Sequence, residues 1–352
     1  MQILRVALCS LVAAGCGGRG ACGAAANPAT DRGLRRGAET LGAMRELGLE
    51  PGATPATSSV FLLGYPNLGL AAIEAATDAP FTGDPSGLHH TYAEDGDGDP
   101  ATCDGDLRHR LDGRHAPLTA AALAGDVDAL IALAEPTDVY THAAFDGHPD
   151  HAVVARAVDA ALARSGRSAR RWATLMHPEG TAACMGPSAR EWPNPAEWDV
   201  EPLARFTPDR DVEPPPVPAC ADGRRPGSWG DAGPPDALVE VPAAMRDPDP
   251  SKNLKWRILA HYASQIDCTT GADGRMHPSC GYIRAFVKRH EFFWTRPFGP
   301  NPVPSGEPGP VLVVAAHPDD EALGFAGVIA TARAAGRRVV VAVVTNGDST
   351  MR

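Results

Sequence analysis

The feature that most constrains the fold is an unbroken apolar run, Val311–Ala316, that ends abruptly in polar residues. The run has the length of one β-strand, and neither of its faces carries a polar side chain, so both faces must be covered. Residues 317–321, with the sequence HPDDE, follow directly, and a helical pattern begins after them. The sequence therefore predicts an α/β fold in which a buried parallel strand ends in a cluster of polar side chains.

This polar cluster indicates a metal site. One imidazole and three carboxylates lie within residues 317–321, and crowded carboxylates repel one another unless a cation holds them. The carboxyl ends of strands are also where ligands bind in open α/β sheets. A metal site needs at least one further ligand, and the best donor is residues 148–151, with the sequence HPDH, which also follow an apolar segment and precede a helical pattern.

Taken together, the HPDDE and HPDH segments resemble the LmbE/PIG-L family of zinc-dependent de-N-acetylases. Further similar segments are TNGD at 345–348, FLLGYP at 61–66, and Lys255-Trp256-Arg257 with Ser264-Gln265. The similar segments span residues 32–205, 252–295 and 309–348. The resemblance implies a Rossmann-like three-layer α/β/α sandwich with a mostly parallel sheet.

The order of the two motifs is reversed relative to that family, in which HPDDE comes first. We therefore expect a circularly permuted single domain, in which the Pro- and Gly-punctuated linker 296–310 joins the family's usual last and first elements. Two alternatives stay open at this point. The C-terminal β-α-β piece could be exchanged between two chains, or the gene could be mis-assembled so that its halves never meet.

The resemblance also implies roles for individual residues. His317, Asp320 and His151 would be the metal ligands, and two imidazoles with one carboxylate leave a position for water, as in catalytic Zn²⁺ sites. Another divalent metal is possible. Asp319 would be the general base, and His148 would stabilise the oxyanion or assist protonation of the leaving amine. The implied reaction is hydrolysis of the N-acetyl group of an N-acetylglucosamine-type sugar or conjugate.

Other interpretations compete with this one. The same ligand set could hold iron(II) in a facial-triad oxygenase, and the chain could be a non-catalytic or inactive glycan-binding protein. Asp320 or Glu321 could merely complement a helix dipole, although we expect Glu321 to brace the loop or a ligand. Asn346 and Asp348 could face sugar hydroxyls or simply form a turn. Asp146 occupies a position where some family members carry a tyrosine.

Charge and composition limit the partners and the organisation. The chain has 352 residues and a formal net charge of −11, which argues against nucleic acid and anionic membranes as partners. We divide it into a signal-like segment (1–24), the larger part of a deacetylase domain with HPDH (25–177), a Pro/Gly-rich extension with helices (178–300), and the first β-α-β of the domain with HPDDE (301–352).

The N-terminus resembles an export signal. Arg5 precedes a brief apolar stretch and small residues, a pattern typical of secretory signals. Ala13-Ala14-Gly15-Cys16 resembles a bacterial lipoprotein cleavage box, which makes a lipid anchor at Cys16 possible. We expect an exported protein, extracellular or periplasmic, with a lipoprotein as one form of it.

Cysteine usage fits export. The chain has eight cysteines; Cys268 and Cys280 could close one loop, and Cys184 and Cys220 could staple the Pro-rich segment. These two pairs leave Cys103 and the cysteines of the signal-like segment without an assigned pairing. Disulfides persist in oxidising compartments, whereas the alternative is a cytosolic enzyme with buried free thiols.

Hydrophobic periodicity predicts the remaining elements. We expect helices beginning at a cap on Thr30 or Asp31 and ending at Gly48, and over 119–133, 150–164, 252–265, 282–294 and 321–335, with strands over 60–63, 138–142, 172–176 and 338–345. Residues 77–118 read as a polar loop region. Within it, the DGDGD segment at 95–99 mimics a calcium loop, but Pro100 stands where the sharp turn needs Gly, so a solvated acidic turn is the better interpretation.

Overall fold

The computed structural model describes residues 27–77, 79–84, 86–93, 103–176, 235–247, 249–266, 283, 286–287, 289–295 and 308–349. Its elements are α1 (Pro28–Arg45), β1 (Val60–Tyr65), α2 (Leu70–Ala75), α3 (Leu107–Asp112), α4 (Ala120–Ala134), β2 (Asp138–His142), α5 (Pro149–Ser165), β3 (Arg170–Thr174), β4 (Ala237–Glu240), the 3₁₀ helix η4 (Ala243–Met245), α6 (Leu254–Leu259), β5 (His290–Phe293), β6 (Val311–Ala315), α8 (Asp320–Ala334) and β7 (Val339–Thr345).

A five-stranded sheet in the order β1-β7-β6-β2-β3 forms the centre of the molecule, and each neighbouring pair is parallel. Counted from β6 as the first strand, through β7, β1 and β2 to β3, this order reads 3-2-1-4-5. That is the order of the doubly wound α/β fold. The predicted Rossmann-like fold is therefore confirmed.

The strands are apolar on both faces because each face packs against helices. In β6, Val311 and Val313 join a core with α1, α6 and α8, whereas Leu312 and Val314 join a second core with α2, α4 and α5. The side chains of β7 alternate in the same way. Alternation between two apolar environments explains why the sequence shows no polar alternation along these strands.

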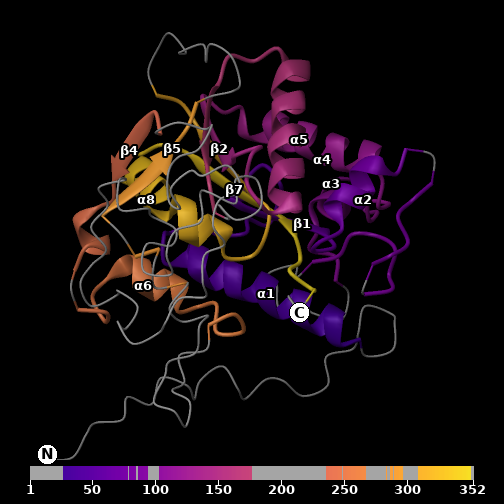
Figure 1. Cartoon of the computed structure of the whole chain (residues 1–352), viewed down its shortest axis with the longest axis horizontal. Coiled ribbons are helices and arrows are strands. Elements are labelled where there is room, and N and C mark those ends of the chain that lie inside the picture. Colours follow the sequence, from indigo (N-terminus) through magenta and orange to yellow (C-terminus); the bar gives the residue numbers. More distant parts are fainter. Residues whose placement is uncertain are drawn as a thin grey trace, which may run out of the picture.

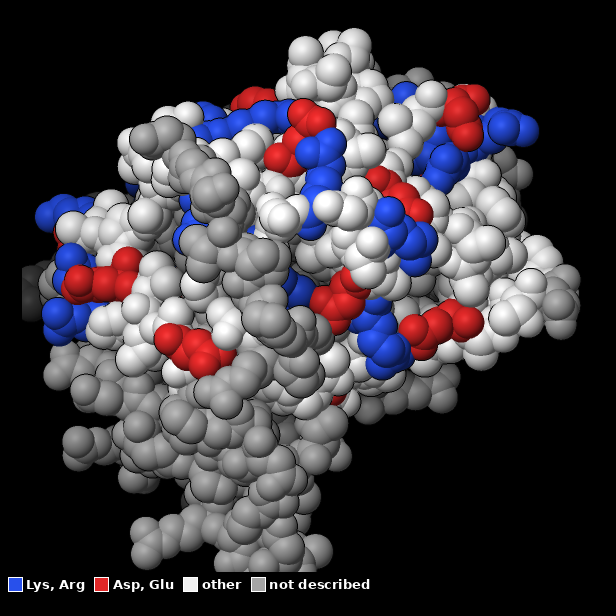
Figure 2. Space-filling model, turned by 90° about the horizontal axis from the view of Figure 1, so that it is seen from above, with Lys and Arg blue, Asp and Glu red and all other residues white. Residues whose placement is uncertain are grey.

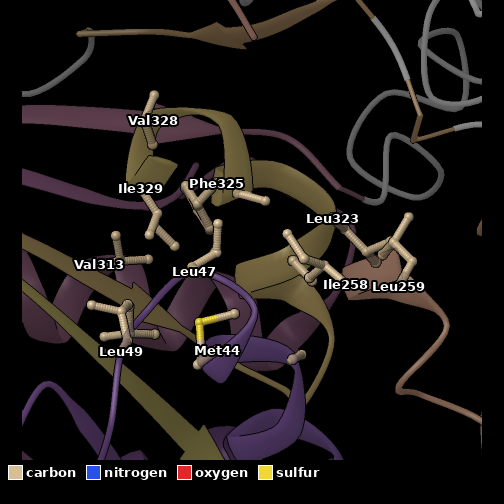
Figure 3. Packing of buried hydrophobic residues seen from close by; sticks show 14 of the residues in the cluster. Met44, Leu47, Leu49, Ile258, Leu259, Val313, Leu323, Phe325, Val328 and Ile329 are labelled. Atoms are coloured by element: carbon tan, nitrogen blue, oxygen red, sulfur yellow. The ribbon is translucent and has the colours of Figure 1, made fainter. Parts of the chain in front are cut away.

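The first of these cores joins pieces from both ends of the chain. Met44 of α1 and Leu47 just after it pack with Phe325 and Ile329 of α8 and with Ile258 of α6. Figure 3 shows these side chains converging between the three segments. Since the cluster is buried from water, the N-terminal, middle and C-terminal segments stabilise one another. In the described part of the chain they form one body.

The end of β7 lies against the start of α1, close to the chain's C-terminus in Figure 1. Arg32 Nε donates to the backbone oxygen of Asp348 at 2.8 Å, and Arg36 Nη1 donates to that of Gly347 at 2.5 Å. In a doubly wound fold a crossover helix would follow β7 and lead to β1. Helix α1 occupies that place although it precedes β1 in the chain, so Arg32 of α1 and Asp348 after β7 lie side by side.

A two-stranded antiparallel sheet, β4-β5, and helix α6 attach to the domain beside α8 (Figure 1). Lys255 Nζ, fully buried, donates to Glu291 Oε1 and to the backbone oxygen of Leu323, both at 2.7 Å. Glu291 in turn accepts from the backbone amides of Gly327 and Val328 at 2.8 and 3.0 Å. This buried pair ties α6 and β5 to the helix that follows the HPDDE segment.

Several local predictions are corrected. The cap of α1 is Asn27, which accepts from the Ala29 amide, rather than Thr30 or Asp31. The helix expected over 282–294 is wrong at its end, because residues 290–293 form β5 and pair with β4. Short apolar runs do not distinguish helix from strand, and here the pairing partner decided. The helix expected over 252–265 is only α6, and the loop region 77–118 contains the short helix α3.

Some predictions lie outside the described residues. These are the signal-like segment, the DGDGD segment and most of the Pro-rich stretch with its cysteines. Cys103 is described and forms a disulfide bond. Within the described residues, no helix combines the length and hydropathy needed to cross a membrane. On the face drawn in Figure 2, basic and acidic side chains lie interspersed.

Candidate metal centre

The HPDDE and HPDH segments emerge at the same point of the sheet. HPDDE follows β6 and leads into α8, whereas HPDH follows the neighbouring strand β2 and leads into α5. These two helices lie on opposite faces of the sheet. The strand order reverses direction here, and in doubly wound folds ligands bind in the crevice at this switch point. The topology therefore places the two motifs side by side where a ligand site is expected.

Three ligand atoms converge at this point. His151 Nε2 lies 3.0 Å from His317 Nδ1 and 3.1 Å from Asp320 Oδ2, and the last two atoms are 3.2 Å apart. Ligand atoms bound tetrahedrally to zinc at about 2.0–2.1 Å lie roughly 3.4 Å from one another. The triangle is therefore close to the size that one such ion requires.

The far nitrogen of each imidazole faces a carboxylate. His317 Nε2 lies 3.3 Å from Asp150 Oδ2, and His151 Nδ1 lies 3.1 Å from Asp146 Oδ1. A carboxylate on the far nitrogen holds the proton there and leaves the near nitrogen with a lone pair, the usual arrangement behind metal-bound histidine. Two nitrogen lone pairs and a carboxylate oxygen then face one point, which is repulsive without a cation between them. The residues therefore fit a metal ion.

The electrostatics agree with this arrangement. Burial alone would lower the pKa of His151, but Asp320 and Asp146 raise it well above its usual value. Burial likewise opposes the charge of Asp320, yet His151 and His142 hold the pKa of that carboxyl well below its usual value. The site thus favours an added positive charge, either a proton on His151 or a metal ion that replaces it.

His142 lines the site without being a suitable ligand. It is buried, its ring stacks on that of His151 with 3.8 Å between centroids, and its Nε2 accepts from the Ala316 amide at 2.9 Å. Burial, followed by the nearby His151, lowers the pKa of His142 to about 4. The ring is therefore neutral, and because its Nε2 lone pair is already engaged, His142 acts as a wall of the site.

Asp319, the residue that precedes α8, has an unusual backbone conformation, with φ at 121° and ψ at −32°. A non-glycine residue in such a conformation costs about 1–3 kcal/mol and persists only when its surroundings hold it. Burial and the charge of Asp320 raise the pKa of Asp319 to about 8. A carboxyl group that takes up a proton near neutral pH suits a general base.

Glu321 holds this turn. Its Oε2 accepts from the Asp319 amide at 3.1 Å, its Oε1 accepts from the Tyr262 hydroxyl, and burial raises its pKa to about 8. Gln265 adds a second brace by donating to the Pro318 backbone oxygen at 2.7 Å. This geometry fits the expectation that Glu321 braces the loop. Tyr262 and Gln265, which donate hydrogen bonds to Glu321 and to the loop, both come from the segment that follows α6.

His148 lies at the rim of the site. Its Nδ1 accepts from the Asp150 amide at 3.2 Å, which makes it the N-cap of α5. In the neutral ring the proton is therefore on Nε2, which can donate a hydrogen bond. The His148 ring lies edge-on to His317 and tilted over His151, with 4.4 and 4.9 Å between centroids. A donor thus stands next to the ligand triangle.

The polar residues that follow β7 form hydrogen bonds within the protein. Asp348 is buried and accepts from the Asn67 amide and the Tyr92 hydroxyl, both at 3.0 Å, while Asn346 Nδ2 donates to the Gly64 backbone oxygen at 3.0 Å. Since these polar groups already have protein partners, the turn interpretation fits better than contacts to sugar hydroxyls.

The structure places the five predicted residues His148, His151, His317, Asp319 and Asp320 close together, and three further residues to which the sequence assigned no part in the site surround them. Asp150 and Asp146 stand behind the imidazoles, and His142 forms the wall. Asp150 was visible as the third letter of HPDH, and its part in the site follows from its contacts with His317 and the Leu68 and Leu70 amides. Asp146 stands out in the sequence only as a departure from the family's tyrosine, and nothing in the spacing marks His142 before the sheet is assembled.

Comparison with known proteins supports a relationship over the C-terminal segment. The model of the PIG-L family, described as GlcNAc-PI de-N-acetylase, matches residues 312–352. This range holds the HPDDE segment together with α8, β7 and all of β6 after Val311, and the chain is similar to the family over this range. Neither the search of curated proteins nor the search of solved structures found a match.

Proposed function

We propose that this protein is a zinc-dependent hydrolase that removes the N-acetyl group from an N-acetylglucosamine-type sugar or glycoconjugate. The observation that carries the proposal is the triangle of His151 Nε2, His317 Nδ1 and Asp320 Oδ2, 3.0–3.2 Å on each side, with Asp319 and His148 beside it. The family match, whose printed name refers to a de-N-acetylase of GlcNAc-PI, supports this reaction and this class of substrate.

His151, His317 and Asp320 would hold the ion. When bound there, zinc lowers the pKa of water toward neutrality and polarises an acyl oxygen. Asp319 accepts the proton of the attacking water and delivers it to the nitrogen of the leaving amine. His148, with its proton on Nε2, donates to the acyl oxygen as that oxygen gains negative charge. The amide C–N bond breaks, and acetate and a free amine are released.

The test is acetate release by the purified protein from N-acetylglucosamine and its conjugates, measured together with bound metal. We expect release that stops when a chelator removes the metal and returns when Zn²⁺ is added. Protein that holds metal at this centre but releases no acetate from any N-acetylated sugar would contradict the proposal. Oxygen consumption with a 2-oxo acid in place of hydrolysis would favour the iron(II) oxygenase instead.

We also propose that the domain is a circular permutation of the LmbE/PIG-L arrangement. Three observations support it: the 3-2-1-4-5 strand order counted from β6, the shared core of α1, α6 and α8, and the hydrogen bond from Arg32 of α1 to the Asp348 backbone oxygen after β7. Active monomer at high dilution, measured by light scattering, is the expected result. Activity that requires a dimer would favour exchange of the C-terminal piece between chains.

Export, with a lipid anchor at Cys16 as one form, remains part of the proposal. The disulfide bond of Cys103 supports an oxidising compartment. Cell fractionation of the full-length chain and of its Cys16→Ser variant tests both points. Protein found only in the cytosol would contradict export, and unchanged membrane association of Cys16→Ser would contradict the anchor.

A further inference from the structure

A second cluster of metal-ligating side chains lies outside the site described above. Asp104, His109 and His115 come from the loop that precedes α3, from α3 itself and from the segment after it. Asp104 Oδ1 lies 3.5 Å from His115 Nε2 and 3.7 Å from His109 Nε2. One ligand atom from each of the three residues lies within 4.8 Å of the others.

Both imidazoles are oriented by contacts on their far side. His109 Nδ1 lies 3.1 Å from the backbone oxygen of Asp104, and His115 Nδ1 lies 2.5 Å from Asp106 Oδ2. Each acceptor is an oxygen, so Nδ1 is the donor in both rings, and the neutral ring then has its lone pair on Nε2. Both Nε2 atoms face Asp104. Partners of this kind orient histidine for a metal ion.

The carboxylate behind His115 is itself fixed. Asp106 is fully buried, accepts from the Thr91 hydroxyl at 3.0 Å, and accepts from the His109 amide at 3.1 Å as the N-cap of α3. The ring of His90 stacks on that of His115, with 4.6 Å between centroids. These contacts hold the imidazole in one orientation before any ion binds.

The same three side chains could simply form surface ion pairs, which nitrogen–oxygen separations of 3.5 and 3.7 Å allow as well. What favours a metal site is that these separations are longer than direct hydrogen bonds between the side chains. They are close to the roughly 3.4 Å that separates two ligand atoms bound to one zinc ion. The three side chains are also 39%, 28% and 24% exposed, for Asp104, His109 and His115 respectively, so an ion can enter from solvent.

We propose that Asp104, His109 and His115 form a second metal site, which binds a divalent transition ion of the zinc class. Two imidazoles and one carboxylate suit this class rather than calcium or magnesium, which prefer oxygen ligands. The position left open by three protein ligands would hold water. Thr91 donates a hydrogen bond to Asp106, and the neighbouring Tyr92 donates one to Asp348 just after β7. An ion at the second site would therefore stabilise the loop before α3 against the carboxyl end of the central sheet.

Metal counting on the full-length chain tests the proposal. The protein is stripped with a chelator, reloaded with Zn²⁺ and freed of unbound metal, and zinc per chain is measured by mass spectrometry. We expect two equivalents in the wild type and one in His109→Ala. His261→Ala removes a histidine that pairs with Glu46 and is the matched control, for which two equivalents are expected.

The His151→Ala variant separates this site from the candidate centre. It should keep one zinc equivalent, and that equivalent should vanish in the His109→Ala/His151→Ala double variant. A wild type with one equivalent that only His151→Ala removes would overturn the second site and leave the proposed function standing. One equivalent that only His109→Ala removes would support the second site and contradict the proposed function.

A conservative variant guards against misfolding. Asp104→Asn preserves the shape of the side chain while removing its charge, so the zinc affinity of this site should fall at least 10-fold with an unchanged circular dichroism spectrum. Acetate release should be unaffected, because Asp104 lies outside the proposed catalytic groups. Equal zinc affinity in Asp104→Asn and the wild type would overturn the proposal.

Discussion

His151 Nε2 and His317 Nδ1 lie 3.0 Å apart although the two residues are 166 positions apart in the chain. Each ring is turned to this position by a carboxylate on its far nitrogen, Asp146 behind His151 and Asp150 behind His317. The contact is made possible by parallel strands β2 and β6, which are neighbours in the sheet and end at the same edge. The candidate metal centre therefore depends on the pairing of two remote strands.

Replacing the carboxylate behind a ligand should weaken metal binding without abolishing it. In Asp146→Asn we expect the zinc affinity of the centre to fall about 10–100-fold, because the amide no longer holds a proton on His151 Nδ1 as strongly. Competition with a chromophoric chelator measures this. Asp128→Asn, which alters an exposed ion pair with Arg164, is the control. Unchanged affinity in Asp146→Asn would show that the contact between Asp146 and His151 has no part in metal binding.

Asp319→Asn should separate the base from the ligands. The amide cannot accept the water's proton, so we expect kcat for acetate release to fall about 10²–10⁴-fold, while zinc per chain stays as in the wild type. Asp320→Asn, by contrast, removes a ligand charge and should lose the ion. Full activity in Asp319→Asn would exclude it as the base, and loss of metal there would make it a ligand.

The role of His148 as a donor predicts a different pattern. In His148→Ala the oxygen that becomes negative loses a hydrogen bond, and kcat should fall about 10²–10³-fold with little change in KM. His148→Gln can still donate and should recover part of the rate. If both variants keep the wild-type kcat, His148 serves only as the cap of α5.

Acid should destabilise the fold through Asp138, whose carboxylate pairs with Arg337 of the C-terminal segment. Burial opposes the charge of this carboxyl, but hydrogen bonds from Arg170, Trp172 and Arg337 lower its pKa overall. A lowered folded-state pKa contributes stability above the unfolded pKa of about 3.9, and this is lost as pH falls through the folded value.

Asp138→Asn should therefore lower the free energy of unfolding by about 1–3 kcal/mol at pH 7 and reduce its loss between pH 5 and pH 2. Urea unfolding of metal-free protein across this range measures both effects. Equal acid sensitivity in the variant and the wild type would contradict this role of Asp138.

Much of the fold was predictable because its signals are local. The apolar runs of β6 and β7 mark strands covered on both faces, and the Val and Ala spacing of α5 marks a helix, since burial on two faces or on one leaves its pattern in the sequence. The strand β5 was mistaken for a helix because its identity depends on pairing with β4, a contact that periodicity does not encode.

By itself, the sequence determined the chemical types available: imidazoles and carboxylates placed directly after two buried strands, in an order opposite to that of the family they resemble. Tertiary structure decided which of them meet. Only the assembled sheet places β6 next to β2 and so brings His151, His317 and Asp320 to one point. Parallel pairing depends on contacts between distant segments, and it does not depend on the order in which the chain supplies them.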